Sequence, residues 1–150
     1  MQVDLRRLSG LVLAALVTVC PWRGFSDART KEITLNERSF LYAQELLEHG
    51  QVLSDLRNAW GEHQPSAQQG NDFIRQRGFA EYAKWHLGID VRHPENTKAR
   101  YKFPFGDFKN IRRSALLAAK SRARQYGYND IEDAANRLLQ MIESKENITQ

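Results

Sequence analysis

The chain has 150 residues, of which 41% are hydrophobic and 27% are charged, and its formal net charge at pH 7 is +4. This length and composition are typical of one globular domain with a core of its own. Cys20 is the single cysteine. The sequence therefore excludes an internal disulfide, a thiolate zinc site and a redox dithiol.

The first 35 residues differ from the rest of the chain. Arg6 and Arg7 precede an uncharged run over residues 8–20, which as a helix would span about 20 Å, short of a bilayer core of about 30 Å. A signal peptide or uncleaved anchor, an apolar helix and a mis-called start are the three interpretations. We predict that residues 1–35 lie outside the fold, that a helical domain covers residues 36–146, and that 147–150 form a tail.

Three helices are predicted in the first part of this domain, and a glycine follows each of them. Capping signals occur at Asn36, or alternatively Thr34, and at Ser66. Residues 89–97 then read as a loop. The predicted helices end before Gly50, Gly78 and Gly88.

The clearest helical pattern lies near the C-terminus. At 100° per residue, the apolar side chains of residues 111–126 share one face, as do those of residues 131–143. The tight connection at Gly127 predicts that the two helices form an αα-hairpin. Because no useful period-2 alternation occurs, the predicted fold class is mainly α: a small helical domain that ends in a C-terminal αα-hairpin.

Aromatic side chains alternate with other residues over 101–108. Pro104 and Gly106 favour an extended segment or an edge strand here over the interior of a sheet. The predicted fold therefore includes one extended aromatic loop, which folds back over the hairpin.

Positive charge is concentrated in one window. Residues 98–124 contain nine basic residues and one acid, whereas the windows 36–97 and 125–150 each carry a net −3. Cations can meet phosphates while neighbouring aromatic rings stack on unpaired bases. We predict a surface for nucleic acid or an acidic protein, made of Lys98, Arg100, Lys102, Lys109, Arg113, Lys120 and Arg124.

A solvated charged face with no partner is the alternative interpretation of this window, its aromatic residues then belonging to the core. A helix-turn-helix is weakly indicated, because the more basic of the two C-terminal helices comes first.

Arg122 falls in the middle of the apolar arc of residues 111–126. A buried guanidinium needs a paired carboxylate. We therefore predict a structural ion pair between Arg122 and Asp107, with Asp130, Glu132 and Glu81 as other candidate partners.

Catalytic and cofactor motifs do not occur in the sequence. The four histidines lack HxxxH and HExxH spacing, and no phosphate-binding loop, dinucleotide fingerprint or nucleophile elbow is found. The sequence predicts no metal, no cofactor, no catalytic residue and no small-molecule ligand. An enzyme is the least favoured alternative, and its site would be assembled around His86, Tyr101 and Arg122.

Three strings, AEYAKWHLGID, TKARYKFPFGDF and RRSALLAAKSRARQYGYNDIEDAANRLL, together resemble a small bacterial protein family of unknown function. The resemblance covers roughly residues 45–142, and a fainter one exists to helical segments of phage-derived proteins. It implies a compact module without an N-terminal targeting segment, and it assigns no catalytic or binding residue.

The sequence thus predicts a non-enzymatic binding module that contacts nucleic acid with weak specificity through the basic window 98–124. A scaffold or regulatory protein that uses the same surface for a protein partner is the alternative. We expect no transmembrane span and a cytoplasmic location, or an exported or membrane-tethered chain if residues 8–20 act as a signal sequence.

Overall fold

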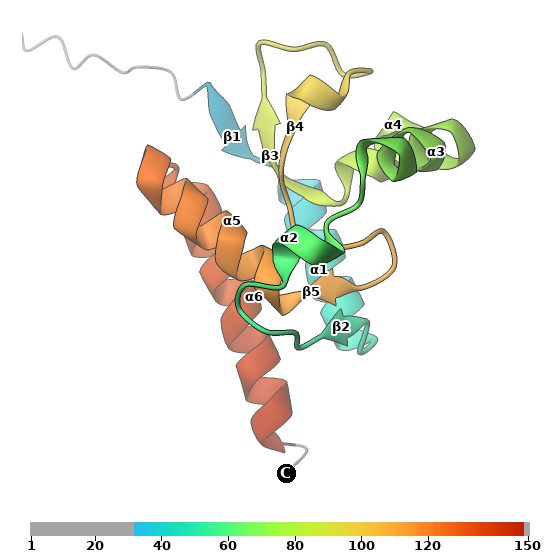
Figure 1. Ribbon diagram of the computed structural model, residues 1–150. Helices are drawn as coiled ribbons and strands as arrows, with labels where there is room; N and C mark the ends of the chain where they lie inside the picture. Colours follow the sequence, from blue (N-terminus) through green and yellow to red (C-terminus); the bar gives the residue numbers. More distant parts are fainter. Residues whose placement is uncertain (1–31, 149–150) are drawn as a thin grey trace, which may run out of the picture.

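The computed structural model describes residues 32–148, in which helices pack around one face of a small sheet (Figure 1). The predicted N-terminal segment lies, except for residues 32–35, outside the described residues. The elements, in chain order, are β1 (Ile33–Leu35), α1 (Glu37–Glu48), β2 (Val52–Leu53), α2 (Trp60–His63), α3 (Ala67–Arg77), α4 (Phe79–Ala83), β3 (His86–Asp90), the 3-10 turn η1 (Lys98–Arg100), β4 (Tyr101–Pro104), β5 (Ile111–Arg112), α5 (Arg113–Tyr126) and α6 (Asn129–Ile148).

The predicted mainly α fold class is wrong. Five strands form two sheets in the described part of the chain: an antiparallel sheet of order β1-β3-β4 and a parallel pair, β2 with β5. The helix predicted over residues 79–87 ends at Ala83, and the predicted aromatic loop begins as strand β4. The strands escaped prediction because each has only two to five residues, too few for a period-2 pattern to stand out.

Gly88 allows the central strand β3 to be packed closely on its neighbours. A Cβ at this position would lie 2.7 Å from Phe103 and 3.2 Å from Ile131. Four of the five residues of β3 are buried, so its sequence shows no alternation of apolar and polar residues. Gly88 therefore marks a close approach inside a strand rather than the end of a helix.

Local capping signals are formed as the sequence indicates. Asn36 caps α1, accepting a hydrogen bond from the backbone N–H of Ser39. Its side-chain amide also donates to the carbonyls of Ala83 and His86, which joins α1 to the start of β3. Ser66 and Gln69 form both bonds of the predicted capping box at α3.

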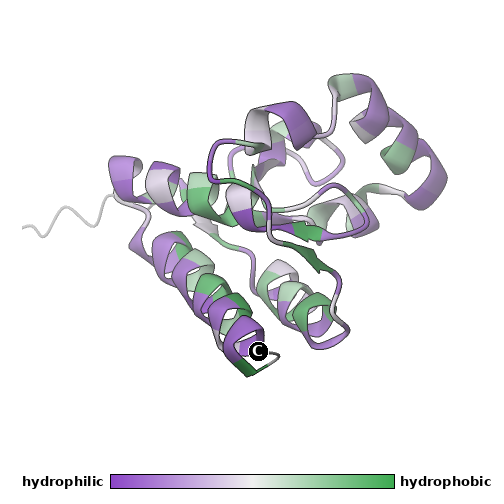
Figure 2. Cartoon of the chain, turned by 60° about the horizontal axis from the view of Figure 1, so that its bottom comes forward, coloured by the Kyte–Doolittle hydropathy of each residue, from purple (hydrophilic) through white to green (hydrophobic). Residues whose placement is uncertain are grey.

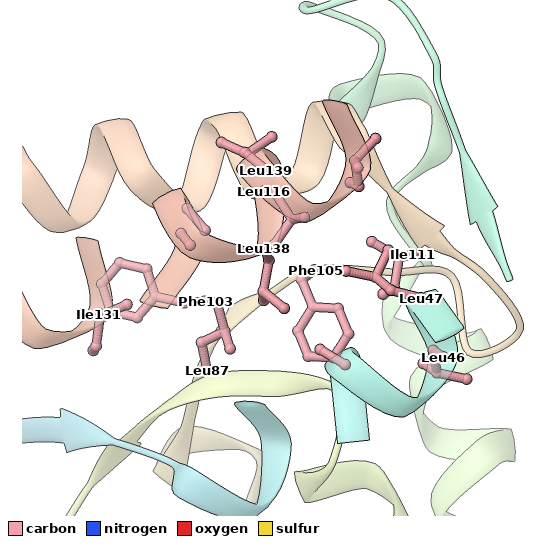
Figure 3. Close-up of a cluster of buried hydrophobic side chains, with 14 of the residues drawn as sticks. Leu46, Leu47, Leu87, Phe103, Phe105, Ile111, Leu116, Ile131, Leu138 and Leu139 are labelled. Carbon is pink, nitrogen blue, oxygen red and sulfur yellow. The ribbon is translucent and has the colours of Figure 1, made fainter. Parts of the chain in front are cut away.

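The core lies between the sheet and helices α1, α5 and α6. Leu87 and Phe103 from the sheet meet Leu138 from α6 in one cluster (Figure 3). Phe105 and Ile111 continue this cluster toward α1 and are fully buried. Along the helices, hydrophobic residues face the interior and hydrophilic residues face outward (Figure 2).

The folded unit begins before residue 36. Ile33, Thr34 and Leu35 pair with Asp90, Ile89 and Gly88, so the edge strand β1 precedes the predicted domain boundary. At the other end, α6 continues to Ile148, two residues into the predicted tail. Over residues 32–148, no helix combines the length and the apolar character needed to cross a membrane.

Candidate nucleic-acid interface

Two cations of the basic window are used inside the fold. Lys98 donates from Nζ to the carbonyl of Ala67 and to Oδ1 of Asn71, at 3.1 and 3.2 Å. Arg100 donates to the carbonyl of His93 at 2.7 Å and lies 3.8 Å from the Glu95 carboxylate. These hydrogen bonds fix the segment before β4 against α3 and the loop that follows β3.

Of the predicted binding residues on α5, Lys120 and Arg113 contact α6 and Arg124 faces solvent. Lys120 donates to Oδ1 of Asn136 at 2.7 Å, and Arg113 lies 3.8 Å from Glu143. Both cations thus tie α5 to α6. Arg124 and Lys109 are exposed, and neither side chain has an ion-pair partner within residues 32–148.

The predicted ion pair between Arg122 and Asp107 is not formed. Asp107 instead accepts a hydrogen bond from Nε of Arg112 at 2.9 Å, and Nη2 of Arg112 lies 2.8 Å from the same carboxylate, because the turn that holds Asp107 leads into β5, where Arg112 lies. Arg122 is exposed, and its guanidinium lies 5.7 Å from the centre of the Tyr126 ring. The helical wheel placed Arg122 on the apolar face, but that part of α5 borders a cleft rather than the core.

Lys102 and Arg122 both line this cleft, which has a volume of about 510 Å³ and is bordered by residues of α2, β4 and α5. Figure 1 shows where these three elements lie. The two residues come from different elements and are twenty positions apart in the sequence. Within the described part of the chain, neither makes an ion pair with a carboxylate. The cleft therefore offers two cations that no carboxylate among residues 32–148 pairs with.

Aromatic side chains share the cleft with the two cations. Trp60, Tyr126 and Tyr128 line the cleft, and Tyr126 is 57% exposed. The rings of Tyr126 and Tyr128 have centres 6.5 Å apart, and Tyr128 makes an edge contact with Phe103. The cleft thus combines positive charge with flat, accessible ring surfaces.

Two residues with a positive φ, Gly127 and Phe103, shape the backbone around the cleft. Gly127 ends α5 with a φ of +74°, and the N–H of Tyr128 then bonds back to the carbonyl of Ala123 at 2.9 Å. The chain reverses here, and Tyr126 before the turn and Tyr128 after it both line the cleft. Phe103, just before Pro104, has a φ of +58°, a strained conformation for an aromatic residue.

Sequence reasoning missed three members of the cleft. Trp60, Tyr126 and Tyr128 were not among the predicted site residues: Trp60 lies between predicted helices, Tyr126 in the predicted helix 111–126, and Tyr128 next to the predicted connection at Gly127. An isolated tryptophan between polar residues is a signal that could have pointed to Trp60. Its proximity to Lys102 depends on the tertiary fold and is invisible in the sequence.

The residues of the enzyme alternative do not share one cavity. Arg122 lines the cleft, Tyr101 lines a hollow beside α4, and His86 lines a third cavity. The ring centres of His86 and Tyr101 are 6.2 Å apart, but Arg122 lines neither of the cavities in which these two residues lie. Among residues 32–148, no three His, Cys, Asp or Glu side chains gather in a way that would hold a metal ion.

No protein-family model, curated protein or solved structure matches this chain. The resemblance to a small bacterial family is left untested by these comparisons and stays a prediction.

Proposed function

We propose that the protein is a non-enzymatic module that binds single-stranded nucleic acid through the cleft between α2, β4 and α5. The observation that carries the proposal is that one concave site combines three aromatic rings with Lys102 and Arg122, two cations that have no carboxylate partner within residues 32–148. Proteins that bind single strands combine cations that follow the phosphates with rings on which bases stack. Such a partner implies a cytoplasmic location.

The packing of α5 favours a single strand over a duplex. A recognition helix places its N-terminal residues on base edges in the major groove. Here the first turn of α5 is enclosed, since Ser114 is fully buried and both its N–H and its hydroxyl donate to Asp55. Arg113 is directed to Glu143 on α6. The cleft, in contrast, is open near the other end of this helix.

Fluorescence anisotropy of the full chain with labelled single-stranded and duplex DNA and RNA, at several salt concentrations, tests the proposal. We expect binding to the single strands and a loss of affinity with salt. In the double variant Lys102→Glu/Arg122→Glu the slope of log K against log salt should fall by about 1.4, because two phosphate contacts are lost. Trp60→Ala should weaken binding by about 1–3 kcal/mol through lost base stacking.

The matched control is Lys109→Glu/Arg124→Glu, which makes the same change in net charge at exposed cations outside the cleft. This variant should retain most of the affinity. Equal losses of affinity in the two double variants would show that the strand binds through the overall positive charge of the protein and not through the cleft. Absence of binding at low salt by a folded chain would contradict the proposal and favour a protein partner.

A further inference from the structure

The cavity lined by His86 has a volume of about 270 Å³ and shares Gln64 and Pro104 with the cleft. Its wall includes His86, Lys98 and Gly70, together with the rings of Tyr82 and Phe108. Typical pockets for drug-sized ligands measure about 300–1,000 Å³, so this cavity suits a smaller molecule. The basic window was expected to bind polymers, and no small-molecule site was predicted here.

His86 presents an unused hydrogen-bond acceptor at this cavity. The residue is 5% exposed, and its Nδ1 lies 2.9 Å from the carbonyl oxygen of Tyr82. A carbonyl oxygen only accepts, so Nδ1 carries the proton and Nε2 holds a lone pair. Nε2 has no hydrogen-bond partner among residues 32–148 and is not fully enclosed. It therefore remains open to a donor in the cavity.

Lys98 gives the wall of this cavity a positive charge. Its ammonium has three N–H donors, and two of them are used by Ala67 and Asn71 of α3. The ammonium approaches α3 closely because residue 70 is a glycine, where an added Cβ would lie 3.0 Å from Nζ. One donor and a full positive charge are thus left for an occupant.

The apolar wall is held in place by a strained residue. Phe108 has a φ of +67°, and its ring stacks on Phe73 at 4.3 Å between centres. Backbone strain of this kind persists only where the surrounding structure imposes it. The occupant of the cavity thus meets one cation, one acceptor and ring surfaces.

We propose that this cavity binds a small hydroxy acid, whose carboxylate pairs with the Lys98 ammonium and whose hydroxyl donates a hydrogen bond to Nε2 of His86. A monoanion matches the single cation. A neutral hydroxyl suits the acceptor better than an ammonium donor, because Lys98 already disfavours positive charge at the imidazole, where it contributes to the lowered pKa. This proposal is independent of nucleic-acid binding in the neighbouring cleft.

Calorimetric titration of the full chain with lactate and with 3-hydroxybenzoate tests the site. The matched probes are benzoate and propionate, which lack the hydroxyl of 3-hydroxybenzoate and of lactate, and 3-hydroxybenzamide and lactamide, which lack their charge. We expect at least one hydroxy acid to bind, and its counterpart without hydroxyl or charge to bind about tenfold more weakly. In the ¹⁵N NMR spectrum, the hydroxy acid should shift Nε2 of His86 and leave Nδ1 nearly unchanged.

Two variants separate the site from the fold. Lys98→Met removes the charge and should weaken binding at least tenfold. Gly70→Ala fills the cavity next to Lys98, yet it should not unfold the chain because alanine favours the helix by about 1 kcal/mol over glycine. Lys102→Glu/Arg122→Glu, in the neighbouring cleft, should leave the affinity unchanged. The proposal is overturned if a folded chain binds neither acid at about 10 mM, or if Lys98→Met and Gly70→Ala bind as the wild type does.

Discussion

Burial sets His86 apart from the exposed histidines of the chain. Removal from water lowers its pKa to about 4, although the hydrogen bond to the Tyr82 carbonyl acts in the opposite direction. In an unfolded chain the pKa is about 6.5. Between these two values the unfolded chain binds a proton that the folded chain excludes, so stability falls as the pH decreases from about 6.5 to about 4.

We therefore expect His86 to contribute about 2 kcal/mol to the loss of stability between pH 7 and pH 5. Urea unfolding at both pH values measures this loss. The variant His86→Phe, which keeps an aromatic ring, should show a smaller difference between the two pH values than the wild type. His63→Ala, at an exposed position on α2, is the control and should retain the full difference. The same pH dependence in both variants would contradict the assignment.

At the scale of elements, α5 depends on a cap from outside its own sequence. Its N-cap residue, Arg112, makes no side-chain cap hydrogen bond. Asp55, from the loop after β2, instead accepts from the N–H and the hydroxyl of Ser114 at 2.8 and 2.7 Å. The start of α5 is thus held by a residue 59 positions away.

Asp55→Ala should lower the free energy of unfolding by about 1–3 kcal/mol, because it removes a helix cap and leaves a buried hydroxyl without a partner. Denaturation followed by circular dichroism measures the change. Asp133→Ala, at an exposed position on α6, should change the stability by less than about 0.5 kcal/mol. If Asp55→Ala lowers the free energy of unfolding no more than this control does, the cap from Asp55 does not stabilise the fold.

Features that depend on contacts local in the sequence were predicted, and features that depend on distant contacts were not. Asn36 and Ser66 act on residues three positions away, and both were predicted. The predicted helix over 111–126 begins two residues late, because Ile111 and Arg112 pair with β2 instead. No local pattern encodes that pairing.

The candidate site divides in the same way. Charge in the window 98–124 was visible in the sequence, but the sequence could not tell that Lys98 is bound to α3 while Lys102 faces the cleft. Arg122 was assigned to an ion pair because a helical wheel separates apolar from polar faces and cannot show where a core ends and an open cleft begins.

For the whole molecule, one cluster of side chains joins the sheet to the helices. Leu138 of α6 is fully buried in this cluster, together with Leu87 of β3 and Phe105. The cluster also includes residues from α1, α5 and α6. A substitution that destabilises the packing of one element should therefore destabilise the sheet and the helices together.

We expect Leu138→Ala to cost about 2–5 kcal/mol in urea unfolding, with fluorescence and circular dichroism reporting the same midpoint. Leu41→Ala, at a position 62% exposed, is the control and should change little. Two separate midpoints, or a loss below about 0.5 kcal/mol for Leu138→Ala, would show that sheet and helices do not share one core.

Strand β4 bears on whether copies of the chain associate with one another through their sheets. In the order β1-β3-β4 one side of β4 carries no strand within the described residues, and such an open side is a template for association between molecules. β4 contains Lys102 and ends at Pro104, a lysine and a proline of the kind that discourage further strand addition. Lys102 would therefore both bind the ligand and discourage strand addition at this edge. A variant that replaces it with an apolar residue should bind the ligand more weakly and aggregate more readily.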